Sequence, residues 1–399
     1  MRARPAWGGG EVSPEIELLL RAAHPGTEPG NDTRIGELMR DGLDWDIVLR
    51  QARAHGTIPL LHWHIQQQGW QPVPAGPQKV LRDDFRRNAA LNLLRTGELL
   101  RLLGRFRARG IAALPFKGPT LAAYAYGSLT LRQFIDLDLL LRPADLAVGQ
   151  EVLLAEDYTS ALDLPPARQA DYLSAIGQAR FYRRRDASLV ELHARVTPRH
   201  FHFPLGVDEF WGRAESLRLQ GKAVPVLSAE DLLLVLSAHG AKHLFACLTW
   251  ISDLAALLLS HPELDLALAL DRARKARCER LLLLGLHLGY DLLQASPPEV
   301  VARGLRADPV ACALAVQVWR GLTRSTPLSG LEGALFHLRV REHFKDGLSY
   351  GLSLALQPTV ADWEVGALPP AASFLYYCLR PVRLAVKYGV RLLGRLGRA

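Results

Sequence analysis

Apolar residues recur at three- and four-residue spacing along the first 110 residues of the chain. This spacing places apolar side chains on one face of a helix, so it predicts a series of amphipathic helices. The last and longest of them carries leucines and alanines between arginines. The helices are expected at residues 14–23, 34–40, 45–55, 59–68 and 78–109.

Short apolar runs alternate with helical segments after Gly110. The run IAALPF is bounded by Lys117-Gly118 and predicts a buried strand, whereas PTLAAYAY opens with a proline, which a first helical turn tolerates, and predicts a helix that stops at Gly127. FIDLDLLLR predicts a second strand. Further helices are expected at 143–156 and 166–177, followed by a hairpin formed by ARFYRRR and LVELHARV.

Helical periodicity returns at Ser228, which has Asp231 three residues later as a weak capping signal. More helices are expected at 263–295 and 298–323, and the chain ends in a basic amphipathic helix. The patterns together predict an α+β fold, in which a small mixed-sheet module is flanked by helical regions. The predicted boundaries are 1–110 for the N-terminal helical region, 111–225 for the module and 226–399 for the C-terminal helical domain.

Two carboxylates lie inside the strand FIDLDLLLR. Residues two apart in a strand point to the same face, so Asp136 and Asp138 project together, while leucines project from the other face. Two neighbouring acids repel each other, and burying them without a partner is costly, so a cation is expected between them. Hard divalent cations with oxygen ligands, above all Mg²⁺, suit such a pair, although a solvated strand edge is the simpler alternative.

A third carboxylate is available in the hairpin strand VELHARV, where Glu191 shares a face with His193. Three acids can hold two Mg²⁺ ions, which activate an attacking hydroxyl and stabilise a leaving oxygen, as in phosphoryl and nucleotidyl transfer. His193 is expected to make a structural hydrogen bond or to tune Glu191.

The turn upstream of the acid pair is suited to bind an anion. Gly118 lets a phosphate approach backbone N–H groups, and the following helix places the positive end of its dipole there. Lys117 and Arg132 can add cationic contacts to the phosphates.

These motifs carry a resemblance to a known family. FKGPTLAAYAYGSLTLRQFIDLDLLLRPADL, VELHARV and LSAEDLLLVLSAHGAKHLFACLTWISDLA together resemble the bacterial uncharacterised nucleotidyltransferase family of the DNA polymerase β-like superfamily. The resemblance implies a nucleotidyltransferase module with Asp136, Asp138 and Glu191 as metal ligands and Gly118 in the phosphate-binding turn. The chain departs from the superfamily pattern in two places: the turn is Lys117-Gly118-Pro119 without a serine, and Glu191 stands where aspartate is expected.

His239, Lys242 and His243 lie on one predicted helix. The four-residue spacing of the histidines could hold a metal, but the segment lacks the glutamate of an H-E-x-x-H zinc motif. We expect this helix to close over the nucleotide with Lys242 near a phosphate. Hydrogen bonding of the histidines between helices is an equal alternative.

Charge and composition bear on the binding partner and the cellular location. The net charge of +8 and the pI near 9.5 favour an anionic partner, which includes nucleotides, nucleic acids and lipid surfaces. The first residues lack the apolar core of a secretory signal, and no run approaches the roughly 18 to 20 uncharged residues that span a bilayer, so a cytoplasmic location without a transmembrane segment is expected.

The favoured function is Mg²⁺-dependent transfer of a nucleotidyl group from an NTP, with ATP among the candidates, to an acceptor hydroxyl, with release of pyrophosphate. The acceptor can be a small molecule, a peptide or a protein, and phosphoryl transfer uses the same metals. Two alternatives stay open: a catalytically silent nucleotide sensor or scaffold, and a basic nucleic-acid-binding protein.

Overall fold

A computed structural model of the chain describes residues 12–162, 172, 176–197, 201, 207–323, 330–363 and 374–384. Its N-terminal part is helical, as predicted, and the expected helix starts and ends agree within a few residues. The main difference is the second helix, which begins five residues early because Glu28 caps it by accepting the Asn31 N–H and Pro29 occupies its first turn. The helices are α1 (Pro14–Ala22), α2 (Pro29–Arg40), α3 (Trp45–Ala54), α4 (Ile58–Gln68) and α5 (Ala75–Ala108).

A five-stranded mixed sheet forms the centre of the module, which confirms the α+β class. The strand order is β1-β2-β5-β4-β3; β2 and β5 run parallel, and the other neighbours are antiparallel. The predicted hairpin is present as β4 and β5, whereas the strand expected over IAALPF is limited to two residues. The strands are β1 (Leu114–Pro115), β2 (Leu137–Leu140), β3 (Thr159–Ser160), β4 (Gln178–Arg183) and β5 (Ser188–His193).

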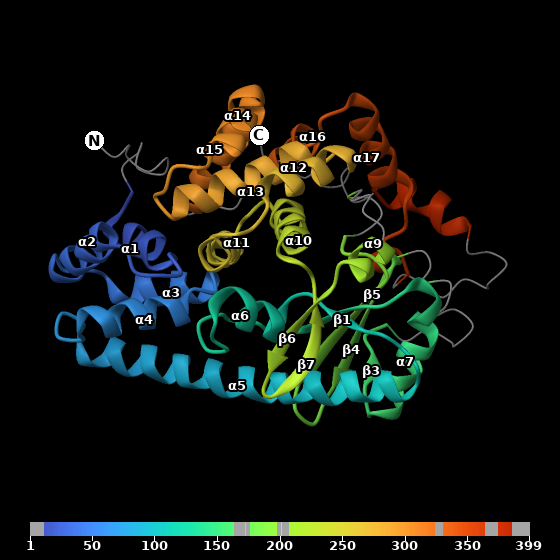
Figure 1. Ribbon diagram of the computed structural model, residues 1–399, viewed down its shortest axis with the longest axis horizontal. Coiled ribbons are helices and arrows are strands. Elements are labelled where there is room, and N and C mark those ends of the chain that lie inside the picture. Colours follow the sequence, from blue (N-terminus) through green and yellow to red (C-terminus); the bar gives the residue numbers. More distant parts are fainter. Residues whose placement is uncertain are drawn as a thin grey trace, which may run out of the picture.

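The long helix α5 and helix α7 (Leu146–Ala155) pack on the apolar side chains of this sheet. Leu139 of β2 and Leu192 of β5 are completely buried there, together with Phe106 of α5. Figure 1 shows α5 running from the N-terminal helices along the whole length of the sheet. The N-terminal region and the module therefore share one element.

Helix α6 (Gly118–Tyr126) follows β1 and ends at Gly127, whose φ of 62° is the left-handed conformation expected of a glycine cap. After β5 come α9 (Val207–Gly212) and a two-stranded hairpin, β6 (Glu215–Leu219) and β7 (Lys222–Val226), which was not predicted.

The C-terminal part of the chain returns to helices. The predicted cap is present, because the Ser228 hydroxyl accepts the Asp231 N–H at 3.3 Å. Each of the two long helical stretches expected at 263–295 and 298–323 is broken once. The helices are α10 (Ala229–Lys242), α11 (Leu248–Ser260), α12 (Leu266–Lys275), α13 (Glu279–Leu292), α14 (Glu299–Ala307), α15 (Pro309–Thr323), α16 (Gly330–Arg339), α17 (Phe344–Leu356) and α18 (Val360–Trp363).

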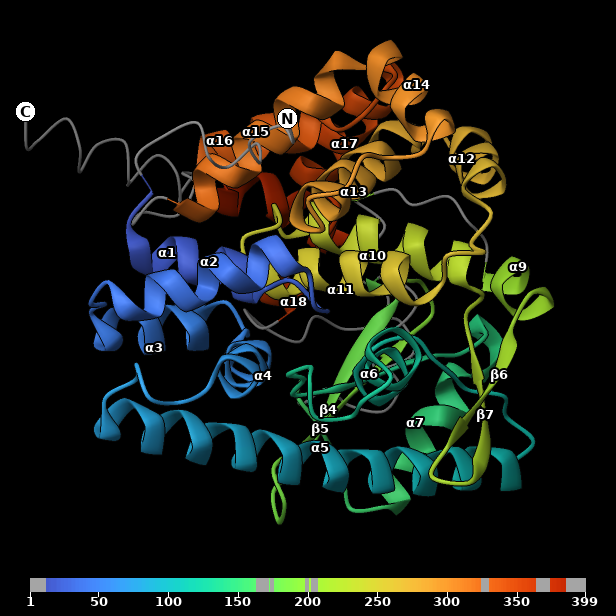
Figure 2. The same cartoon turned by 60° about the vertical axis from the view of Figure 1, so that its left-hand side comes forward.

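One apolar core joins the helices of both ends of the chain. It contains Leu19 of α1, Ile65 of α4, Leu236 of α10 and Ile251 of α11, all buried. Figure 2 shows α1 to α4 beside α10 and α11, with α6 and the sheet below them. The expected division at residues 110 and 225 stays a prediction.

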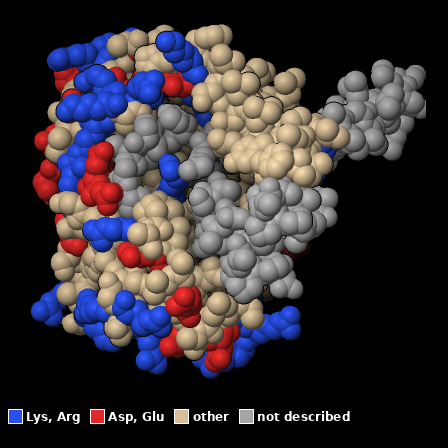
Figure 3. All heavy atoms as spheres, turned by 90° about the vertical axis from the view of Figure 1, so that its right-hand side faces the viewer, with Lys and Arg blue, Asp and Glu red and all other residues tan. Residues whose placement is uncertain are grey.

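On the face shown in Figure 3, charged side chains gather over the left and lower parts of the view, whereas the described surface at the upper right is largely free of them. Within the part of the chain that the structure describes, none of the helices combines the length and the apolar character needed to cross a bilayer. The polar helix expected at 166–177 and the basic terminal helix lie largely outside the described residues.

Candidate active site

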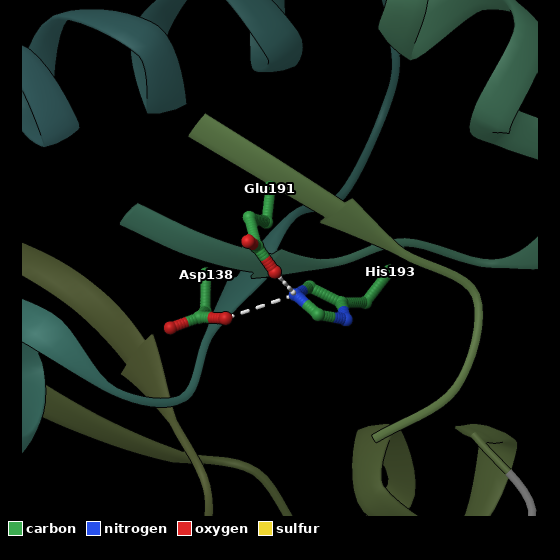
Figure 4. A group of neighbouring side chains, drawn as sticks. All are labelled: Asp138, Glu191 and His193. Carbon is green, nitrogen blue, oxygen red and sulfur yellow. Dashed lines mark hydrogen bonds and ion pairs between the residues drawn. The ribbon is translucent and has the colours of Figure 1, made fainter. Parts of the chain in front are cut away.

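The carboxylates of Asp138 and Glu191 lie next to each other on neighbouring strands. Parallel pairing of β2 with β5 sets Asp138 directly opposite Glu191. Both side chains are buried, with 2% and 6% exposure. Together with His193 they form a group whose ligand atoms lie within 4.8 Å of one another (Figure 4). We call these three residues the acid cluster.

Protein cations neutralise the acid cluster. The Lys117 ammonium lies 3.0 Å from Asp138 Oδ2, and His193 Nε2 lies 2.9 Å from Asp138 Oδ1 and 3.4 Å from Glu191 Oε2. Arg180 of β4 pairs with Glu191 Oε1 at 2.6 Å, and Gln178 donates to Glu191 Oε2 at 3.0 Å. Each carboxylate therefore has protein partners. Lys117 holds Asp138 through a single contact, which a bound cation could replace.

These contacts shift the titration of the cluster. Burial opposes ionisation of Asp138, yet the charges of Lys117 and His193 hold its pKa well below the usual range. The pKa of Glu191 is also lowered despite burial, mainly by its hydrogen bond with His193. Burial disfavours the charged ring of His193, but its bonds to the two acids raise its pKa. The two carboxylates are therefore ionised at neutral pH, as metal ligands must be.

Asp136 lies at the edge of the acid cluster, one residue before β2 begins. It is half-buried, and burial together with the negative charges of Asp138 and Glu191 raises its pKa. The group of three potential ligands contains His193 and does not contain Asp136. The role of Asp136 as a metal ligand stays a prediction.

The Lys117-Gly118 turn packs directly against the acid pair. Gly118 adopts a φ of 60°, and a Cβ there would meet the backbone oxygen of Asp136 at 3.2 Å. Both features favour glycine at this position. Gly118 opens α6, and the Thr120 hydroxyl donates to the Lys117 carbonyl at 2.9 Å. The backbone of the predicted anion site therefore lies beside the carboxylates.

Helix α5 holds the loop that leads to the acid pair. Asn92 donates through Nδ2 to the carbonyls of Leu129 and Arg132, both at 2.7 Å, and Arg95 donates to the Phe134 carbonyl at 2.9 Å. Neither α5 residue was predicted to be part of the site. Their signal in the sequence is a pair of polar residues facing inward on an amphipathic helix, and only the fold shows what they contact.

Arg132 is buried in a pair with Asp253 of α11. Its Nε and Nη2 donate to the two carboxylate oxygens at 2.7 and 2.9 Å, and the Tyr126 hydroxyl donates to the same carboxylate at 2.8 Å. This pair ties the loop between α6 and β2 to the C-terminal helices. The expected phosphate contact of Arg132 stays a prediction.

The C-terminal end of α10 brings His239, Lys242 and His243 to the acid cluster. Burial and the charge of Lys117 lower the pKa of Lys242, and among the described residues this amine has no ion-pair partner. Burial and nearby cations lower the pKa of His243 to about 4 and that of His239 well below its usual value, so both rings are neutral at pH 7. The two rings pack against Trp250, with centroids 5.7 and 5.1 Å away.

Comparison with known proteins agrees with this geometry. A family model described as uncharacterised nucleotidyltransferase matches residues 41–294, which is well over half of the chain. The chain belongs to this family. The match to the uncharacterised nucleotidyltransferases includes α3 to α13 and therefore every residue of the acid cluster. Searches of curated proteins and of solved structures give no match.

Two residues of β4 that contact the acid cluster, Gln178 and Arg180, were also not predicted. Gln178 and Arg180 contact Glu191 because β4 pairs antiparallel with β5, which places Arg180 opposite Glu191 and Gln178 opposite His193. His193 was expected to make a structural hydrogen bond or to tune Glu191. It bonds to Asp138, and its contact with Glu191 at 3.4 Å lowers the pKa of that carboxyl. The alternating pattern of the hairpin sequence indicates which residues share a face of each strand. Only the register of β4 against β5 shows which of them lie next to Glu191 and His193.

Proposed function

We propose that the protein is a Mg²⁺-dependent nucleotidyltransferase that moves a nucleotidyl group from an NTP to an acceptor hydroxyl and releases pyrophosphate. The observation that carries the proposal is the register of β2 with β5, which sets Asp138 opposite Glu191, both buried. Membership of the nucleotidyltransferase family supports the class of reaction.

The donor set of the acid cluster suits a hard divalent cation, because two ionised carboxylates converge within 4.8 Å. Asp138 and Glu191 would hold a first Mg²⁺ and Asp136 would complete the ligands of a second. When bound, such ions lower the pKa of an attacking hydroxyl and neutralise charge on the leaving pyrophosphate. His193 would orient both carboxylates, since its Nε2 lies within 3.4 Å of each.

The cations around the acids would receive the triphosphate. Lys117 holds Asp138 through one contact of 3.0 Å, so its ammonium can transfer to a phosphate oxygen when another cation neutralises the carboxylate. Lys242 is a half-buried amine without an ion-pair partner among the described residues, and a phosphate would supply one. Gly118 would let phosphate oxygens approach the first turn of α6.

A catalytically silent nucleotide sensor is the second candidate. Lys117, Arg180 and His193 already neutralise Asp138 and Glu191, at distances of 2.6 to 3.4 Å, which favours a fold that holds its acids without a metal. The two candidates share nucleotide binding and differ in turnover.

Transfer of label from NTPs tests the proposal. The protein is incubated with Mg²⁺, each NTP labelled at the α phosphorus, and pools of small-molecule, peptide and protein acceptors. We expect pyrophosphate release and labelling of an acceptor by the wild type and by Asp208→Asn, a surface control, and loss of both in a folded Asp138→Asn variant. Undiminished turnover in Asp138→Asn would refute the assignment, and nucleotide binding without any release would favour the sensor.

A further inference from the structure

A cavity with the chemistry of a ligand site lies between α4 and α5, and none of its lining residues belongs to the acid cluster. Its volume is about 330 Å³. It is lined by aromatic, amide and cationic side chains: His62, Gln66, Trp70, Arg82, Phe85 and Arg86. We call it the α4–α5 pocket. Figure 2 shows α4 lying above the first half of α5, beside the sheet.

The aromatic side of the pocket is already ordered. His62 stacks on Phe85 with ring centroids 3.9 Å apart and an angle of 4° between the planes. Trp70 meets the edge of His62 at 5.2 Å, and the Arg82 guanidinium lies over the Trp70 ring at 4.3 Å. Such planar surfaces accept a further planar group by stacking, and the guanidinium adds a cation–π contact.

The cationic side has unused charge. Among the described residues Arg82 has no ion-pair partner, and Arg86, which is exposed, approaches the Asp83 carboxylate only at 3.8 Å. Other basic residues nearby on α5 are paired more closely: Lys79 lies 2.8 Å from Asp83. Two guanidinium groups at one pocket provide a site for phosphate.

His62 has a buried ring nitrogen that makes no hydrogen bond within the described part of the chain. The ring is 7% exposed, and its Nδ1 is buried without a hydrogen-bond partner among the described residues. Burial, with the charges of Arg82 and Arg86, lowers the pKa of His62 to about 4, so the ring is neutral at pH 7 and the orphaned nitrogen calls for a polar group. Gln66 adds an amide at the same pocket.

We propose that the α4–α5 pocket binds a nucleoside phosphate in addition to any nucleotide at the acid cluster. The ring of such a ligand would lie against Trp70 and Arg82, its polar edge would reach Gln66, and its phosphate would pair with Arg86. This assignment stands apart from the proposed catalytic function. None of the six residues that line the pocket belongs to the acid cluster, so the two candidate sites can be changed independently by substitution.

The α4–α5 pocket lies close to a residue of α5 that holds the loop between α6 and β2. Asn88, one turn after Phe85, donates through Nδ2 to the carbonyls of Thr130 and Arg132 at 3.3 and 3.4 Å. A ligand seated on Phe85 would therefore bind next to the residues that hold the loop before Asp136.

Calorimetry with the full chain in a metal-free buffer tests the proposal. The probes are AMP, GMP, CMP and UMP, with adenosine and ribose 5-phosphate as partial ligands. We expect at least one monophosphate to bind with Kd below about 1 mM, and both partial ligands to bind at least about tenfold more weakly. The double variant Arg82→Gln/Arg86→Gln, which removes both guanidinium groups of the pocket, should weaken binding at least about tenfold. Arg87→Gln is the matched control: this arginine lies on the same helix, pairs with Asp84 at 3.5 Å, and should not affect binding when it is replaced.

Asp138→Asn separates this site from the acid cluster and should bind the monophosphate as tightly as the wild type. The proposal is overturned if the wild type binds none of the four monophosphates at several millimolar concentration, if ribose 5-phosphate binds as tightly as the nucleotide, or if binding is lost in Asp138→Asn and kept in the double arginine variant. A thermal unfolding curve for each variant confirms that the fold is intact.

Discussion

Asp138 and Asp253 are both buried carboxylates, with 2% and 1% exposure, but their partners differ in kind. Asp253 receives two parallel N–H donors from Arg132 and a hydroxyl from Tyr126. Asp138 receives an ammonium from Lys117 and one ring nitrogen from His193, and has a second acid, Glu191, opposite it. The carboxylate oxygens of Asp253 are both occupied by the fixed Arg132 guanidinium, whereas Asp138 can exchange its partners for a bound cation.

This difference separates a structural acid from a candidate catalytic one. A bidentate guanidinium fixes a carboxylate in one geometry and leaves it little capacity to bind anything else. A lysine is a mobile point charge, and two adjacent acids repel each other, so their carboxylates keep an affinity for a further cation. Burial alone would rank the two aspartates equally, and the type of partner distinguishes them.

The largest expected effect is the loss of stability in Asp253→Asn. The change leaves the Arg132 guanidinium buried with a neutral partner, which typically costs about 3 to 5 kcal/mol of the free energy of unfolding. Chemical denaturation measures it, with Asp208→Asn as a surface control. A loss below about 1 kcal/mol would show that the closed pair is not the structural tie described above.

Glu191→Gln is expected to lower Mg²⁺-dependent turnover by at least about 100-fold, or about 2.7 kcal/mol of activation free energy, because it removes a ligand charge without changing the volume. The pyrophosphate release rate measures this, with Glu209→Gln as the control. Turnover within a factor of about two of the wild type would show that Glu191 has a structural role, as Asp253 does, and is not needed for catalysis.

Lys242→Met tests whether a lysine without an ion-pair partner among the described residues binds substrate, in contrast to Arg132, which is held by Asp253. Loss of a charged contact to phosphate should raise the KM for the NTP by about tenfold. Because burial lowers the pKa of Lys242, the charged amine is less favourable in the folded chain than in the unfolded chain, so it destabilises the fold wherever it is protonated, and this penalty disappears as the pH rises toward the ordinary lysine pKa. Lys242→Met should therefore be more stable at pH 7, and its advantage should shrink as the pH rises toward that ordinary value. A variant less stable at pH 7 with an unchanged KM would contradict this reading.

Glu191→Asp should have the smallest effect, a change in turnover of less than about tenfold, because it keeps the carboxylate ligand and shortens its reach by one methylene. Steady-state kinetics with Mg²⁺ measures it. A loss as large as that of Glu191→Gln would mean that the longer side chain, held by Arg180 and Gln178, is required for the geometry of the site.

Much of the fold was predictable because its signals are local. The helix α6 is bounded by Pro119 and Gly127, and α10 starts at the cap on Ser228, so both follow from short-range rules. The hairpin of β6 and β7 was missed because its sequence, ESLRLQGKAVPV, alternates weakly and includes a proline. The expected single helix at 263–295 is interrupted between Lys275 and Glu279.

The candidate site was predictable where it depends on one strand and less so where it depends on pairing. Alternation alone placed Asp138 and Glu191 on polar faces. Their opposition, and the contact of Arg180 with Glu191, depend on the register of three strands. The pairing of Arg132 with Asp253 joins residues 121 positions apart, which no local pattern can indicate.

The most direct test of the central claim is a crystal structure with Mn²⁺ and a non-hydrolysable NTP, in which anomalous scattering locates the metal. The account predicts a Mn²⁺ peak bound to the carboxylate oxygens of both Asp138 and Glu191, at ligand distances of about 2.2 Å, with the triphosphate at Gly118 and Lys117 released from Asp138. A triphosphate bound while Lys117 keeps its contact with Asp138, with no metal between the two acids, would contradict it.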